Sequence, residues 1–256
     1  LYFLAPAVAL FPAFALGGTL PFAPWLHESA DKAGMWAMWT PIAHVDIGIL
    51  YVMAISSLGV YGVVLAGYAS NNKYSLLGGL RSSAQLISYE LAMGVSLAAI
   101  VMATGSLKMT EMVRVQEGAL WGGVPWLQNW FVFTPFGLVA AIIFLICMVA
   151  ETNRAPFDLP EAENEIIAGY HTEYSSMKFA LFFLAEYSHM ITSCALMTCL
   201  FLGGGEPLPF VGLLAESTAP WAAAIKYAVM WGKISTLIVF FMLIRWTVPR
   251  FRFDQL

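Results

Sequence analysis

Carboxylic acids gather in one short polar segment of an otherwise apolar chain. The segment, residues 150–174, lies between two long apolar runs. It carries six of the 16 acidic residues among the 256 of the chain: Glu151, Asp158, Glu161, Glu163, Glu165 and Glu173. If the stretch is helical, Glu161 shares a face with Asp158 and Glu165, because residues three and four apart are neighbours on a helix. Crowded carboxylates cannot all ionise independently, so we expect a coupled set that takes up and releases protons.

A solvated charge run is the ordinary explanation for clustered acids. Here aromatic and aliphatic side chains are interspersed among them: Phe157, Leu159, Ile166, Ile167 and Tyr170. This mixture argues against a plain solvated loop. Arg154, four residues before Asp158, is the nearest counter-charge in the sequence. Pro156 and Pro160 should stop the preceding helix from running on.

Three charged side chains lie two turns or more inside the expected spans, namely Glu90, Glu186 and Lys233. Each costs roughly 2.5–3.5 kcal/mol at the centre of a membrane helix, and such residues nearly always face the bundle interior. A buried Glu–Lys pair that fixes helix packing is one explanation. We favour a proton relay, because burial favours the neutral form of a carboxyl and lets it exchange protons at working pH.

The composition places the chain in a membrane. It is 60% hydrophobic and 11% charged, with a mean hydropathy of +0.75. Soluble domains carry about 25% charged residues, so too little polar surface is available to cover a soluble globule. The apolar runs approach the roughly 20 residues that a membrane helix needs. They are continuous rather than alternating, which favours a helical bundle over a barrel.

We therefore predict an all-α, polytopic transmembrane bundle. The expected spans are residues 1–17, 46–68, 82–104, 130–150, 175–202 and 220–246. A polar turn is expected at 69–81 and a short amphipathic helix near 109–116. No internal repeat or linker interrupts the chain, so residues 1–256 are expected to form one transmembrane domain.

The distribution of Lys and Arg predicts the orientation. One set of loops holds seven of them: Lys73, Arg81, Arg154, Lys178, Arg245, Arg250 and Arg252. The opposite set holds Lys32, Lys108 and Arg114. Cytoplasmic loops carry the excess of basic residues, which places the acidic loop, 150–174, and both termini on the cytoplasmic side.

The sequence offers no pattern for a metal or nucleotide site. Cys147, Cys194 and Cys199 fall in apolar runs and are expected to be small buried side chains. The histidines have no ligand-like spacing, and we expect structural or interfacial roles, with His171 the best candidate for a proton carrier. We predict no bound metal and no nucleic-acid partner. The chain begins at Leu1 without a basic flank, which predicts no signal peptide and a start part-way through a longer protein.

The run ETNRAPFDLPEAE, residues 151–163, resembles the signature of one family, the quinone-site membrane subunit of respiratory complex I, the NADH-quinone oxidoreductase. The match continues through residues 70–90, 173–187 and 249–255, so it covers the chain from the second expected span on. An equivalent subunit occurs in membrane-bound hydrogenase and ferredoxin- or plastid-type complexes, which stays an alternative. The full run AETNRAPFDLPE most resembles the bacterial NADH-quinone branch.

The resemblance implies a membrane subunit of a proton-pumping NADH:quinone oxidoreductase in the bacterial inner membrane. Such a subunit anchors the hydrophilic arm, forms much of the quinone tunnel and begins a chain of buried carboxylates. Quinone is then the substrate, and flavin and iron–sulfur clusters belong to partner subunits. The expected partners are other membrane-arm subunits, the quinone-site subunits of the hydrophilic arm and membrane lipid.

By motif, the proton relay falls on Glu90, Glu151 and Glu186. The quinone cavity and its adjacent loop fall on Arg81, Arg154, Phe157, Asp158, Glu161, Glu163, Glu165 and Glu173. Family members usually have eight spans against six expected here, so a first and a last span are absent from this sequence. A passive scaffold, an ion channel and a secondary transporter are the rival classes. The internal symmetry or paired broken helices expected of the last two are not visible in the sequence.

Overall fold

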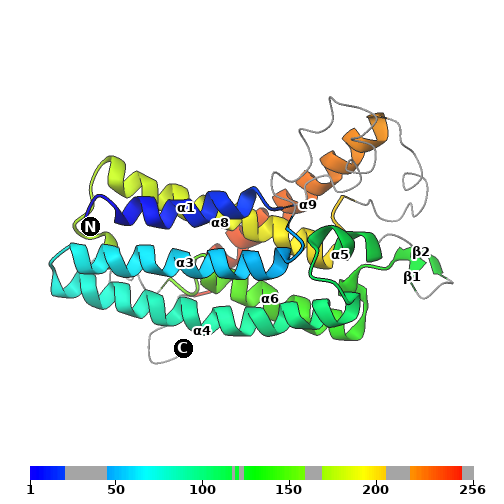
Figure 1. The fold of residues 1–256 in the computed structure, drawn as a ribbon, viewed down its shortest axis with the longest axis horizontal. Helices are drawn as coiled ribbons and strands as arrows, with labels where there is room; N and C mark the ends of the chain where they lie inside the picture. Colours follow the sequence, from blue (N-terminus) through cyan, green and yellow to red (C-terminus); the bar gives the residue numbers. More distant parts are fainter. Residues whose placement is uncertain (21–44, 117–118, 121–123, 159–168, 206–219, 250–256) are drawn as a thin grey trace.

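A computed structural model describes residues 1–20, 45–116, 119–120, 124–158, 169–205 and 220–249. This part of the chain contains long apolar helices that correspond one to one with the expected spans: α1 (Ala5–Gly17), α3 (Gly48–Ala69), α4 (Lys73–Thr104), α6 (Pro135–Glu151), α8 (Met177–Phe201) and α9 (Pro220–Thr247). The predicted all-α, polytopic class is therefore confirmed (Figure 1). The described residues also form smaller elements: α5 (Met109–Val115), the 3-10 turns η3 (Phe131–Phe133) and η4 (Gly169–His171), and an antiparallel hairpin of β1 (Ala119–Leu120) and β2 (Val124–Gln128).

The helices differ in whether they alone can cross a bilayer. Within the described residues, α3, α4, α8 and residues 224–247 of α9 are long and apolar enough. The apolar helices α1 and α6 are shorter, with 13 and 17 residues. The expected span at 130–150 begins as the turn η3, and α6 starts only at Pro135. There Thr134 caps the helix, since its Oγ1 accepts a hydrogen bond from the Gly137 amide at 3.2 Å.

The polar turn expected at 69–81 is wrong over most of its length. Helix α4 already begins at Lys73, after Asn72, whose Oδ1 accepts from the amide of Tyr74 at 3.1 Å. Its 32 residues make it about 48 Å long, against a hydrocarbon core of about 30 Å. Arg81 therefore lies on a helix, and Glu90 lies near the middle of α4. The short helix expected near 109–116 is confirmed as α5.

Close backbone contacts hold the long helices of the bundle together. Helix α1 packs between α3 and α8, and α4 packs against both α3 and α6 (Figure 1). A Cβ on Gly62 would lie 2.7 Å from backbone atoms of Ala9, so α1 and α3 touch through their main chains. Small residues at such contacts let membrane helices approach closely. One buried core draws side chains from all six long helices and from α5.

Candidate functional site

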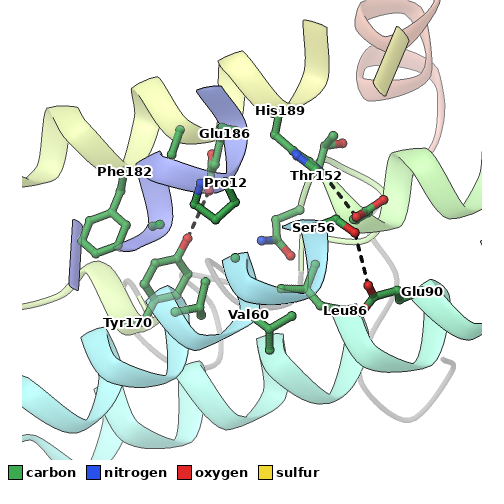
Figure 2. Close-up of a pocket in the computed structure, with 17 residues that line it drawn as sticks. Pro12, Ser56, Val60, Leu86, Glu90, Thr152, Tyr170, Phe182, Glu186 and His189 are labelled. Carbon is green, nitrogen blue, oxygen red and sulfur yellow. Dashed lines mark hydrogen bonds and ion pairs between the residues drawn. The ribbon is translucent and has the colours of Figure 1, made fainter. Parts of the chain in front are cut away.

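A cavity lies between α1, α3, α4, α6 and α8, and the space inside it is about 670 Å³ when its open mouth is counted. Its lining includes Glu90 from α4, Glu151 at the end of α6 and Glu186 from α8. Figure 2 shows Glu90 and Glu186 directed into this cavity rather than toward the outside of the bundle. The structure thus brings together the three carboxyls that the sequence predicted as a relay, which lie far apart in the chain.

Glu90 is held by two hydroxyls of α3. The Ser56 Oγ lies 3.2 Å from Glu90 Oε1, and Ser57 Oγ also donates to this oxygen. Both hydroxyls lie equally within reach of the Met53 carbonyl, at 3.0 and 2.9 Å. A hydroxyl has one hydrogen but can also accept. The serines can therefore donate to an ionised Glu90, or turn to Met53 and accept from a protonated one.

Glu186 lies among a phenol, an imidazole and a guanidinium. The Tyr170 hydroxyl donates to its Oε1 at 3.1 Å, and His171 Nε2 lies 3.9 Å from the same oxygen. The guanidinium of Arg154 lies 3.9 Å from Oε2 and stacks 4.3 Å above the ring of Tyr187. The Glu186 side chain is only 12% exposed. These contacts fix the direction in which the carboxyl group points.

Glu151 pairs with a histidine of α8. The distance from His189 Nε2 to Glu151 Oε1 is 3.3 Å, and the two side chains are 19% and 9% exposed. From the sequence we expected a structural or interfacial role for His189, with His171 the better candidate for a proton carrier. A signal for His189 was present, because it follows Glu186 by three residues and so lies on the same face of α8. Nothing local in the sequence pointed to Ser56, Ser57 or Tyr170.

The residues expected next to the quinone cavity are more scattered. Phe157 packs edge-on against Tyr89 of α4, with ring centroids 5.3 Å apart, and Asp158 is buried. Gln85 ties this segment to α6, because its Nε2 donates to the carbonyls of Ala150 and Phe157, both at 2.9 Å. None of these side chains lines the large cavity.

Two further expected residues lie away from the cavity lining, namely Arg81 on α4 and Glu173. Glu173 is exposed, and its Oε1 accepts from Asn72 Nδ2 at 2.9 Å. The expected Glu161, Glu163 and Glu165 lie outside the described residues. Among the side chains that the structure describes, no group of three or more His, Cys, Asp or Glu could hold a metal ion.

Lys233, the third ionisable residue predicted within a span, lies at another place. Its ammonium donates to the carbonyls of Leu202 and Gly204 at 2.7 and 2.8 Å, and it lies 4.0 Å above the ring of Trp130. A cation at the carboxyl end of a helix, here α8, is stabilising. Lys233 is absent from the lining of the cavity that holds the three glutamates.

Comparisons with known proteins cover the whole chain. Residues 1–256 match the family described as NADH dehydrogenase. The chain is 46% identical over 263 residues to the NADH-quinone oxidoreductase H subunit of Leptospira biflexa serovar Patoc, covering all of this chain and 69% of that protein. It is 43% identical over 266 residues to the H 2 subunit of Koribacter versatilis and 42% over 258 residues to the H 1 subunit of Cytophaga hutchinsonii. Those two matches cover all of this chain and 71% and 70% of the relatives.

Proposed function

This chain belongs to the NADH dehydrogenase family, among the H subunits of bacterial NADH-quinone oxidoreductases, and on that premise we propose that its glutamate cavity couples quinone reduction to proton movement. The chain is a multi-pass protein of the inner membrane and a subunit of a respiratory enzyme complex. The resemblance found in the sequence is confirmed at the level of the family.

One observation carries the proposal: three carboxyl groups from three helices converge on one cavity inside a membrane bundle. Charged groups in a membrane are expensive and mark ion or proton pathways. Carboxylates that share a site hold their protons jointly, so a new charge nearby redistributes the protons over the whole set. The hydroxyls around Glu90 can serve either protonation state, as a relay requires.

Reduction of a quinone by two electrons requires two protons to complete the quinol. Flavin and iron–sulfur clusters on partner subunits would supply the electrons, whereas this chain contributes geometry and electrostatics. Asp158 and Arg154, with Phe157, Arg81, Glu173 and the acids at 161, 163 and 165, would border the quinone. Arg154 links the residues that would border the quinone to the glutamate cavity, because it follows Glu151 in the chain by three residues and contacts Glu186.

The same proposal gives the protein its place in the assembly. The acidic loop would face the quinone-site subunits of the hydrophilic arm and anchor them. The apolar outer faces would contact other membrane-arm subunits and lipid. Large exposed aliphatic side chains on α4, such as Leu91 and Val95, at 72% and 71% exposure, suit such an environment.

The test is to replace Glu186 or Glu90 with Gln in the whole enzyme, reconstituted in vesicles. We expect proton movement per quinone reduced to fall by about tenfold or more, since an amide cannot carry the proton. Glu111→Gln is the matched control, because this carboxyl lies on α5 beside Arg114 and outside the cavity. If both cavity variants reduce quinone and pump protons like the parent enzyme, the relay role is wrong.

Asp158→Asn separates the quinone role from the relay role. We expect it to raise the apparent KM for quinone while protons moved per quinone stay unchanged. If the amount of assembled enzyme falls and the KM of the remainder is normal, the segment has a structural role only.

A further inference from the structure

Two cavities meet at a set of polar side chains. A second cavity, of about 340 Å³, lies deeper in the bundle than the first. The residues that line both are Ser56, Glu151 and His189. The rest of the deeper lining is apolar except for Thr192 and Ser193 on α8. The passage between the cavities is therefore bordered by groups that can pass a hydrogen bond.

The deeper cavity extends away from the acidic segment. Thr192 and Leu196 lie one and two turns beyond His189 on α8, and Phe144 lies two turns before Glu151 on α6. Since α6 ends and α8 begins at the acidic segment, these residues lie further toward the opposite membrane face. A proton that leaves the glutamate cavity in this direction must pass the His189–Glu151 pair.

The pair has the geometry to share one proton. With 3.3 Å between Nε2 and Oε1, the proton can lie on the imidazole as an ion pair or on the carboxyl as a neutral pair. Either arrangement keeps a hydrogen bond between the two side chains. Moving the proton from Nε2 to Oε1 leaves a neutral imidazole and a carboxylic acid, so the net charge of the pair is unchanged.

The surroundings supply the charge that would drive this step. The charged groups that act on the imidazole are Glu151 from α6, Glu90 from α4 and Glu186 from the same helix. Helix α3 contributes the Ser56 hydroxyl to the shared lining, and α1 contributes apolar side chains only. A change in the protonation of Glu90 or Glu186 therefore acts directly on the proton held by His189.

We propose that His189 and Glu151 form a proton-sharing pair through which protons leave the glutamate cavity for the deeper cavity. The inference rests on the proposed function and adds a histidine to the carboxylate relay. His189 receives a proton from the Glu90–Glu186 side and passes it to Glu151. The proton then enters the deeper cavity past Thr192 and Ser193, and the pair returns to its starting state with the next proton.

The experiment uses His189→Gln in the whole enzyme in vesicles, because Gln keeps an N–H donor toward Glu151 but cannot carry a proton. We expect proton movement per quinone reduced to fall by about tenfold, as for loss of a positioned proton carrier. A carbodiimide, which modifies protonated carboxyls, gives a second readout. Without the imidazole to hold the proton, labelling of Glu151 should rise in H189Q. Unchanged pumping together with unchanged labelling overturns the proposal.

Further variants keep the test decisive. Glu151→Gln must lower proton movement to the same extent, and the double variant must be no worse than either single one, because both act on one step. E151Q that pumps normally refutes the pair even if H189Q fails to assemble. If E186Q loses coupling while H189Q keeps it, this inference fails and the proposed function stands. If neither E186Q nor H189Q changes proton movement, both this inference and the proposed function fail.

Discussion

At the scale of single residues, the contacts of each carboxyl define what it can do. Glu186 has a phenol donor on one oxygen and a guanidinium near the other, whereas the two serine hydroxyls at Glu90 can reverse their direction. Glu151 has a titratable partner of its own. The three carboxyls thus have chemically different partners, and a variant of each partner can be tested separately.

Tyr170→Phe tests the phenol. The substitution removes the 3.1 Å hydrogen bond to Glu186 but keeps the ring, which packs against Phe182 with centroids 5.7 Å apart. An intramolecular hydrogen bond contributes up to about 1.5 kcal/mol, so quinone reduction should fall by up to about tenfold at constant pH. Tyr187→Phe is the control, since its ring would stay beneath Arg154. Equal rates for both variants would contradict a role for the Tyr170 hydroxyl.

The sequence predicted the three carboxyls but not their partners, for a physical reason. An acid inside an apolar run is visible as such, because its burial must be compensated. Ser56 and Tyr170 are ordinary residues for a membrane helix and a loop, and their importance comes only from contacts 34 and 16 residues away in the chain. Such contacts depend on how helices pack, which a single sequence does not encode visibly.

At the scale of elements, the cavity depends on how closely α1 approaches α3. A methyl group on Gly62 would meet the backbone of Ala9 at 2.7 Å, so Gly62→Ala must push the two helices apart. Overpacking of this kind costs roughly 1–3 kcal/mol, and the thermal midpoint of the solubilised protein should drop by several degrees. Gly59→Ala on the same helix is the matched control, because its added methyl has no atom of another described element within 4 Å. The expectation fails if the two variants melt together.

The start of α4 illustrates where prediction from the sequence failed. The sequence predicted a polar turn through residue 81, a stretch that includes Gly78 and Gly79. In the structure both glycines are helical and serve as contact points: Gly78 meets Gly169 of η4, and Gly79 meets Gly67 of α3. Glycine usually weakens a helix because it loses more backbone entropy on folding. Here it permits close contacts between helices that offset this cost.

The opposite end of the bundle contains an exposed ion pair that should depend on pH. Lys108 Nζ lies 2.8 Å from Asp46 Oδ1 and joins the start of α3 to the start of α5. The hydrogen bond and charge of Lys108 lower the pKa of Asp46 below its usual 3.8, and Asp46 raises the pKa of Lys108 above its usual 10.5. Stability from Asp46 is present above pH 3.8 and lost as the pH falls further; stability from Lys108 is lost as the pH rises past 10.5.

Lys108→Met should therefore lower the thermal midpoint by only about 1–2 °C between pH 5 and pH 9, since exposed pairs contribute little. The difference from the parent should shrink at high salt, and it should decrease as the pH falls below 3.8 and Asp46 becomes protonated. Thermal melts at several pH values and two salt concentrations measure this. A difference that persists unchanged at pH 3 would mean that packing of the lysine stem, not its charge, is responsible.

At the scale of the whole molecule, the two ends of the described helix bundle carry different charged groups. The end at which α6 stops and α8 starts holds Arg154, Asp158 and Glu173, and the other holds α5 and the Asp46–Lys108 pair. The six long apolar helices and this difference between the ends were predictable from hydropathy and charge alone. The organisation of residues 1–256 as one domain stays a prediction.

The orientation of these two ends is the last prediction. Lys73 is the first residue of α4 and Lys108 lies four residues beyond its last, so the two mark opposite ends of the helix, and both are exposed. The excess of basic residues places Lys73 on the cytoplasmic side and Lys108 on the other. Single Lys→Cys variants at these positions should react with a membrane-impermeant maleimide from opposite sides: K73C in inverted vesicles and K108C in right-side-out vesicles. The native Cys147, Cys194 and Cys199 are at most 2% exposed and should give little background. Reaction of K73C from the outer face would reverse the orientation, and the acidic loop could not then meet electron carriers in the cytoplasm.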